Sequence, residues 1–217
     1  MIPVPISLDA PDAKRLQILG CDMTGMIRAF IAIELTQELK GVLREIGRQL
    51  EARIAPGTVR WVKPEAMHLT LVFLGDTPAD RLDAIHQAIS GAASPIPPVT
   101  LTATGLGCFP NPRRPRVVWV GVDEPAGHLG RLKRALDRQL VPLGYRPERR
   151  SFSPHLTLGR VHKRAGRADA AHLGEVIAGA TLTDAGVMTA QQVHLIRSDL
   201  RPGGPIYTIL ASAPLSG

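Results

Sequence analysis

The sequence predicts an α+β protein of two pseudo-symmetric halves, each with an antiparallel sheet flanked by helices, and a cleft between them. Three observations support this prediction. The tetrapeptide His-Leu-Thr-Leu occurs twice, at His68–Leu71 and His155–Leu158, which lie 155 − 68 = 87 residues apart. Strand-like apolar runs alternate with amphipathic stretches, but without the strict rhythm of a parallel βα fold. The sequence also contains no glycine-rich phosphate loop of the usual kinds.

In the first half, expected over about residues 26–95, strands and helices alternate. Strands are predicted at Arg28–Leu35, Val59–Val62 and His68–Leu74. Helices are predicted over 37–54 and from Pro78 to about Ile89. Thr36 and Thr77 stand where N-cap residues are expected, each just before a helical pattern. The Ser-, Pro- and Ala-rich stretch 92–98 is the predicted crossover to the second half.

The second half, expected over 96–217, repeats this theme. Strands are predicted at Val99–Thr104, Val117–Val122, the second His-Leu-Thr-Leu segment, Val193–Ser198 and Tyr207–Ser212. One helix is indicated by leucines at helical spacing, namely Leu129, Leu132, Leu136 and Leu140. Gly144 is expected to end it. A further helix is predicted at about Asp169–Ile177.

Composition narrows the class of protein. Lysine and arginine exceed aspartate and glutamate by 26 − 19 = 7, which favours anionic partners, nucleic acid first. Two cysteines and no apolar run long enough to cross a bilayer favour a cytoplasmic protein without a membrane segment. Residues 1–25 lack periodicity and are expected to be a disordered extension or the product of a misplaced start. No interface pattern is visible, so a monomer is expected.

The repeated motif carries the candidate chemistry. On a strand, His and Thr of each copy point to one face and the two leucines to the other. Two such strands side by side would line a pocket with His68, His155, Thr70 and Thr157. An imidazole can act as general acid or base near neutral pH, and a hydroxyl can donate to a phosphate oxygen. Two imidazoles without a nearby carboxylate or thiolate do not make a zinc site, so no metal is expected.

The motifs and their flanks resemble the 2H phosphoesterase superfamily, and within it the LigT-like RNA 2′,3′-cyclic phosphodiesterases of bacteria and archaea. The resemblance runs from about Met26 to Leu215. It is carried by RAFIAIEL at 28–35, VRWVKPEAMHLTLVFLG at 59–75, GLGCFPNPRRPRVVWVGV at 105–122, RSFSPHLTLGRV at 150–161 and HLIRSDL at 194–200. It implies a bilobal fold and hydrolysis of a 2′,3′-cyclic phosphate to a 2′-phosphomonoester without a cofactor. It also implies that His68 is the general acid and His155 the general base, although the residues alone do not assign these roles.

Further residues are candidates for substrate contacts. Arg160 and Arg28 are candidates for the phosphate, although Arg160 alternates away from His155 if its strand is regular. Phe73 and Phe152 could stack on bases, and Arg149 and Arg150 could contact the RNA backbone. Packing is the alternative explanation for the two phenylalanines, and solvation is the alternative for the arginines.

The expected partner is RNA with a 2′,3′-cyclic phosphate end, tRNA fragments included. Some members of the family also run the reverse reaction and join RNA ends through a 2′–5′ linkage. Two other interpretations stay open: a phosphodiesterase for 2′–5′ oligonucleotides or small cyclic nucleotides, and a non-catalytic RNA-binding module.

Overall fold

The structure is a computed structural model that describes residues 25–202 and 204–217. The expectation for residues 1–25 therefore falls outside the described residues, apart from Gly25. The strands are β1 (Met26–Glu34), β2 (Val59–Trp61), β3 (His68–Pro78), β4 (Val99–Phe109), β5 (Val117–Asp123), β6 (His155–Val161), β7 (Val187–Ala190), β8 (Gln192–Arg201) and β9 (Gly204–Pro214). The α-helices are α2 (Gln37–Glu51), α3 (Leu82–Ala93), α4 (His128–Leu140) and α5 (Arg167–Ala178). Short 3₁₀ turns occupy Pro64–Ala66, Ala79–Arg81 and Val141–Leu143.

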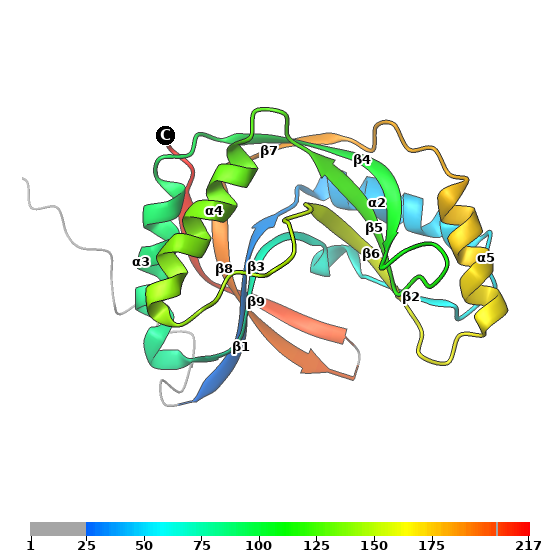
Figure 1. The fold of residues 1–217 in the computed structure, drawn as a ribbon, viewed down its shortest axis with the longest axis horizontal. Helices are drawn as coiled ribbons and strands as arrows, with labels where there is room; N and C mark the ends of the chain where they lie inside the picture. The colour runs from blue at the N-terminus through cyan, green and yellow to red at the C-terminus, as the bar shows by residue number, and fades with distance from the viewer. Residues whose placement is uncertain (1–24, 203) are drawn as a thin grey trace, which may run out of the picture.

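The strands form one curled antiparallel sheet in two halves, which confirms the predicted α+β class (Figure 1). The order is β7-β4-β5-β6-β3-β1-β8-β9, and β2 adds to β6. We call β3, β1, β8 and β9 the first half-sheet, and β6, β5, β4 and β7 with β2 the second. The two half-sheets are joined where β3 meets β6, at the register pair Leu69 and Leu156.

The two half-sheets are not continuous stretches of chain, unlike the expected division at residue 95. β8 and β9 come from the C-terminal end but extend the first half-sheet, because β8 pairs with the free edge of β1. β2 comes from the first half of the chain and pairs with β6. Strand pairing between segments this far apart in sequence leaves no local signal, so the sequence pattern could not indicate it.

One pair of helices lies against each half-sheet (Figure 1). α3 packs on α4 and β9, and α4 also contacts β3. α2 contacts β6, and α5 contacts β4. Thr36 caps α2 as predicted, because its Oγ1 accepts a hydrogen bond from the Leu39 N–H at 3.3 Å. None of the described helices is long and apolar enough to span a membrane.

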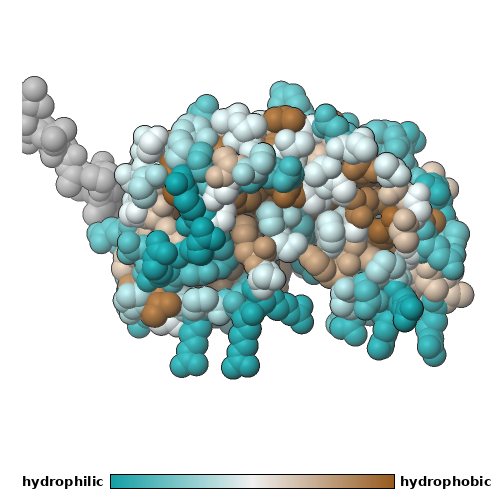
Figure 2. All heavy atoms as spheres, turned by 45° about the horizontal axis from the view of Figure 1, so that its top comes forward, coloured by the Kyte–Doolittle hydropathy of each residue, from teal (hydrophilic) through white to brown (hydrophobic). Residues whose placement is uncertain are grey.

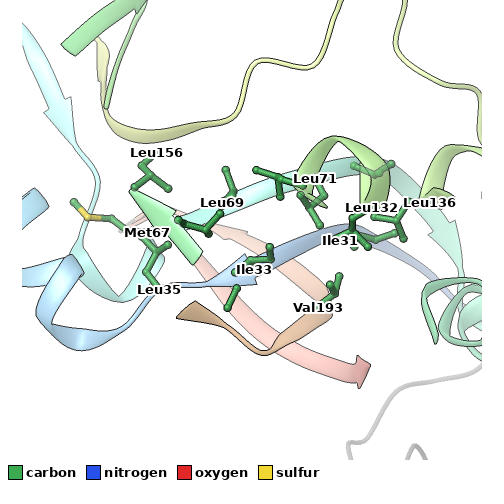
Figure 3. Close-up of a cluster of buried hydrophobic side chains, with 14 of the residues drawn as sticks. Ile31, Ile33, Leu35, Met67, Leu69, Leu71, Leu132, Leu136, Leu156 and Val193 are labelled. Atoms are coloured by element: carbon green, nitrogen blue, oxygen red, sulfur yellow. The ribbon is translucent and has the colours of Figure 1, made fainter. Parts of the chain in front are cut away.

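The leucines of both motifs enter the hydrophobic core, as the alternation predicts. Figure 3 shows Leu71 with Ile31 of β1 and with Leu132 and Leu136 of α4. All four are buried, as are the remaining motif leucines. Burying a leucine side chain contributes roughly 1.5–3 kcal/mol, so the core fixes both motif strands in place.

The predicted start of the second helix was wrong. β3 continues to Pro78, and α3 begins at Leu82 after a 3₁₀ turn, without a side-chain cap. Thr77 pairs with Ile27 of β1 and is fully buried, so it cannot act as an N-cap. Its Oγ1 instead accepts a hydrogen bond from the Tyr145 hydroxyl at 3.3 Å. Nothing in the sequence pattern indicated β7, or the extension of β4 to Phe109.

Candidate active site

The two His-Leu-Thr-Leu motifs lie side by side on β3 and β6. Because Leu69 pairs with Leu156 in an antiparallel register, the neighbouring positions place His68 beside Thr157 and Thr70 beside His155. Opposed residues share a face of the sheet, and both leucines are buried on the other face. The two imidazoles and two hydroxyls therefore converge on one surface, as the repeat predicted.

Both histidines are held in the same way. The Nδ1 of His68 lies 2.9 Å from the carbonyl oxygen of Ala66, and the Nδ1 of His155 lies 2.8 Å from that of Ser153. A carbonyl can only accept, so each Nδ1 carries its proton and donates. This fixes the tautomer and leaves each Nε2 available to accept or deliver a proton.

Aromatic rings enclose His68. Its ring centroid lies 4.7 Å from that of Phe30 and 5.2 Å from that of Tyr207, which meets it edge-on. The pKa of His68 is lowered from 6.5 to about 4, mainly because the imidazole is buried. The nearby ammonium of Lys40 lowers this pKa further, whereas the hydrogen bond to the Ala66 carbonyl raises it. The free protein therefore holds His68 neutral at pH 7.

His155 is flanked by aromatic rings from the second half-sheet. Phe109 meets it edge-on at a centroid distance of 4.9 Å, and Trp119 lies 6.2 Å away. Each imidazole is thus fixed by a carbonyl two residues upstream and by two aromatic side chains. This restricts the ring to one orientation before any ligand binds.

The shared face lines a cavity of about 990 Å³ that both half-sheets contribute to. The two motif strands contribute His68, Thr70, Leu71, Phe73, His155, Thr157 and Arg160 to its wall. Its basic residues are Arg60, Lys63, Lys133, Arg150, Arg160 and Arg201, against one acidic residue, Glu148. Lys133 is neutralised by Asp137 at 2.6 Å. Hydrophilic side chains project on both sides of the recess between the halves (Figure 2). A cavity of this size and charge suits a nucleotide or a longer anionic chain.

Arg160 faces this cavity because β6 is not regular. The register with β5 passes from Val118 opposite Gly159 to Trp119 opposite Thr157, so Leu158 is the extra residue of a β-bulge. Leu158 and Gly159 are both buried, and the alternation resumes with Arg160 on the side of His155 and Thr157. The sequence expectation that Arg160 points away assumed a regular strand.

Some of the other predicted residues line the cavity and others lie outside it. Phe73, Phe152 and Arg150 line the cavity. Arg28 is exposed on β1 opposite Asp76 and is not among the lining residues. Arg149 is exposed in the loop before β6 and is also outside the lining.

Sequence reasoning assigned no role to Phe30, Tyr207 or Phe109, which enclose the histidines. Phe30 lies in a run of buried apolar residues, so its pattern indicates a core residue. Tyr207 reaches the site from β9, through strand pairing that the sequence does not reveal. The signal that could have found Phe109 is its place in the stretch 105–122, which carries part of the family resemblance.

Metal ligands do not cluster here. Within the part of the chain that the structure describes, no three His, Cys, Asp or Glu side chains lie together as a metal site would need. The reactive and charged groups that the two motifs and the basic residues bring to the cavity are two imidazoles, two hydroxyls and several guanidinium and ammonium groups.

This fold and this pair of anchored histidines define a two-histidine phosphoesterase. The chain belongs to the LigT-like phosphoesterase family, whose model matches residues 33–119 and again 120–207. The two matches are offset by 120 − 33 = 87 residues, the same offset as between the two histidines. The duplication inferred from the tetrapeptide therefore extends over nearly the whole described chain.

Curated relatives and solved structures agree with this family. The chain is 38% identical over 182 residues to an RNA 2′,3′-cyclic phosphodiesterase of Methanothermobacter thermautotrophicus, a match that spans 84% of this chain and 95% of the relative. A relative with the same name from Aquifex aeolicus is 31% identical over 88% of this chain and 99% of its own length. The crystal structure of the TT0787 protein of Thermus thermophilus aligns with a TM-score of 0.73 at 26% identity, over 88% of this chain and 99% of that one. The complex of Escherichia coli LigT with 3′-AMP aligns with a TM-score of 0.69 at 26% identity and with the same coverage.

Proposed function

We propose that this protein hydrolyses RNA 2′,3′-cyclic phosphodiester ends to 2′-phosphomonoesters by two-histidine acid–base catalysis without a metal. The observation that carries the proposal is the pair of anchored imidazoles, each with its Nε2 available, on one face of β3 and β6. The names of the curated relatives support the same substrate class. The net positive lining of the cavity supports an anionic substrate.

The proposed reaction is a single displacement at phosphorus. A water oxygen attacks phosphorus, and its proton passes to the Nε2 of His155. The bond between phosphorus and the 3′ oxygen breaks, and that oxygen takes a proton from the Nε2 of His68. The product keeps the phosphate on the 2′ oxygen and has a free 3′ hydroxyl. Solvent then returns both imidazoles to their starting protonation states.

The assignment of His68 as acid and His155 as base follows the family resemblance. The low pKa of His68 in the free protein adds a condition, because a general acid must be protonated when the leaving oxygen departs. A bound phosphodiester carries a negative charge, which raises the pKa of a neighbouring imidazole. Substrate binding would thus raise the pKa of His68 and favour its protonated form.

The remaining predicted residues take binding roles in this proposal. The hydroxyls of Thr70 and Thr157 donate to the non-bridging phosphate oxygens, and Arg160 neutralises charge that develops on them. Phe73 and Phe152 offer faces on which bases stack, and Arg150 contacts the backbone. Arg28 and Arg149 lie outside the cavity lining and could act only on more distant parts of a long RNA. We further propose that the protein acts in the cytoplasm as a monomer, with tRNA fragments among its substrates.

A second candidate substrate is a small nucleotide. Structures of Escherichia coli LigT hold 3′-AMP and ATP, which are mononucleotides, and NADP+, which is a dinucleotide. The same two histidines would open a mononucleoside 2′,3′-cyclic phosphate. With a 5′ hydroxyl in place of water as the nucleophile, they would instead join the cyclic phosphate end to a second RNA: the 5′ oxygen bonds to phosphorus, the 3′ oxygen leaves with a proton, and a 2′–5′ linkage results.

The test is a cleavage assay in EDTA with a short RNA that ends in a 2′,3′-cyclic phosphate. Wild type is compared with His68→Ala and His155→Ala, and circular dichroism checks that each variant is folded. Conversion to a 2′-phosphate by wild type, with a loss of about 10²–10⁴-fold in each variant, is the expected result. A folded wild type that converts neither this RNA nor a mononucleoside cyclic phosphate would leave the non-catalytic RNA-binding module as the better interpretation.

A further inference from the structure

Two arginines face each other across neighbouring strands at one end of the cavity. Arg60 of β2 is in direct register with Arg160 of β6. Both are exposed, and both line the cavity. Like charges directly opposite one another destabilise a sheet. This pair therefore needs an explanation other than folding stability.

Arg60 points to the cavity from the face of β2 opposite the packing of its neighbours, although Trp61 also borders the cavity. Val59 is buried. The ring of Trp61 packs closely against Gly47 of α2 and Gly159 of β6. A methyl group added to Gly47 would lie 3.4 Å from this ring, and one added to Gly159 would lie 3.0 Å from it. Side chains alternate along a strand, so Arg60 stands on the face opposite this packing, together with Arg160.

Neither guanidinium is neutralised by the protein. Across residues 25–202 and 204–217, no hydrogen bond or ion pair involves either side chain. Glu148, the acidic residue of the cavity lining, forms no ion pair with either of them. The positive charge of Arg160 does reach Tyr207, where it opposes the rise in pKa that burial causes. Two unpaired guanidinium groups on one face are suited to bind a phosphate.

We propose that Arg60 binds the phosphate that links the reacting nucleotide to the nucleotide before it, beside Arg160 at the reacting phosphate. Arg160 lies three residues beyond Thr157 along β6, on the order of 10 Å for an extended strand. Arg160 can thus reach the reacting phosphate from one side, while Arg60, one strand further out, meets the next phosphate along the chain. The protein would then favour oligonucleotide ends over mononucleoside cyclic phosphates. This inference rests on the proposed function.

The experiment compares two substrates that share the reacting group: cytidine 2′,3′-cyclic phosphate, and the dinucleotide in which adenosine precedes it. The protein is tested as wild type, as Arg60→Gln, and as Arg134→Gln. Arg134 is an exposed arginine of α4 outside the cavity lining, so its variant controls for the loss of one positive charge. Wild type is expected to have a higher kcat/KM for the dinucleotide. Arg60→Gln should lower that kcat/KM about tenfold, mainly through KM, with a much smaller effect on the mononucleoside. Arg134→Gln should keep the wild-type preference.

Two results would overturn the inference: an equal loss on both substrates, or an unchanged dinucleotide preference in Arg60→Gln. A merely structural role for Arg60 predicts a lower melting temperature, whereas relief of the like-charge pair predicts an equal or higher one. If wild type turns over neither substrate, the proposed function fails. In that case the inference is tested by binding. The affinities of the mono- and dinucleotide 2′-phosphates are measured for wild type and for Arg60→Gln, and only wild type should prefer the dinucleotide.

Discussion

Phe73 and Arg160 occupy equivalent positions in the two halves of the molecule. Each lies five residues after its motif histidine, since 73 − 68 and 160 − 155 are both 5. Each follows a β-bulge, at Leu71 in β3 and at Leu158 in β6, that turns it to the cavity. The duplicated strands thus keep His and Thr in common, and at this position on the cavity side one half offers a ring and the other a charge.

Phe73→Ala should weaken RNA binding without loss of stability. The side chain is 64% exposed, so its removal should change the free energy of unfolding by no more than about 0.5 kcal/mol. Base stacking on an aromatic ring is worth roughly 1–3 kcal/mol, so KM for an RNA substrate should rise about tenfold or more. Steady-state kinetics and urea unfolding measure the two effects. Val141→Ala, at an exposed apolar residue outside the cavity, should alter neither.

The acid and base roles can be assigned with an activated leaving group. A p-nitrophenyl phosphodiester of a nucleoside needs little help from an acid, because its leaving group is stable as an anion. If His68 is the acid, His68→Ala should recover most of its activity on this substrate, while His155→Ala should stay about 10²–10⁴-fold impaired. The opposite pattern, with rescue of His155→Ala, would exchange the two roles.

The low pKa of His68 should make stability depend on pH. The folded state holds this imidazole neutral down to a pKa of about 4, whereas the unfolded chain takes up the proton near 6.5. The unfolded state therefore binds more protons between these values, and stability falls as pH falls from 6.5 to 4. The loss should be on the order of 3 kcal/mol. His68→Gln should lack this contribution. His194, whose pKa burial also lowers, is present in both proteins, so the difference in urea unfolding between pH 7 and pH 4.5 isolates His68.

Gly159→Ala should disturb the attachment of β2. A methyl group there would lie 2.5 Å from Cγ1 of Val59 and 3.0 Å from the Trp61 ring, so β2 must move away from β6. Overpacking of this kind costs about 1–3 kcal/mol, and it should also displace Arg60 and reduce any preference for dinucleotides. Gly41→Ala is the matched control. Nothing lies within 4 Å of the added methyl group, so this change inside α2 should stabilise the protein by about 0.5–1 kcal/mol. Equal melting temperatures for the two variants would contradict the prediction.

Local patterns predicted most of the site. The alternation of His and Thr with leucine was enough to predict which side chains enter the core and which enter the cavity, because a strand has a period of two residues. The direction of Arg160 could not be predicted in this way. A bulge shifts the alternation by one residue, and Gly159 next to Leu158 is compatible both with a bulge and with close packing of a neighbouring strand.

Long-range pairing set the remaining limit. Tyr207 reaches His68 because β9 pairs with β8 and β8 with β1, over a sequence separation of more than a hundred residues. The cross-strand pair of Arg60 and Arg160 depends on a register of the same kind. The repeated motif was enough to predict that His68 and His155 meet, whereas contacts made through strand pairing without a repeated motif were not found from sequence.

The addition of β8 to β1, and of β9 to β8, also determines when the site is complete. A nascent chain that has emerged only as far as β3 already displays His68 and Thr70, but one edge of β1 is bare and Tyr207 does not yet exist. His155 is synthesised 87 residues after His68, but the first half-sheet is complete only when β8 and β9 have also been synthesised. The full set of groups that surround the two histidines is therefore present only after β9 has been synthesised.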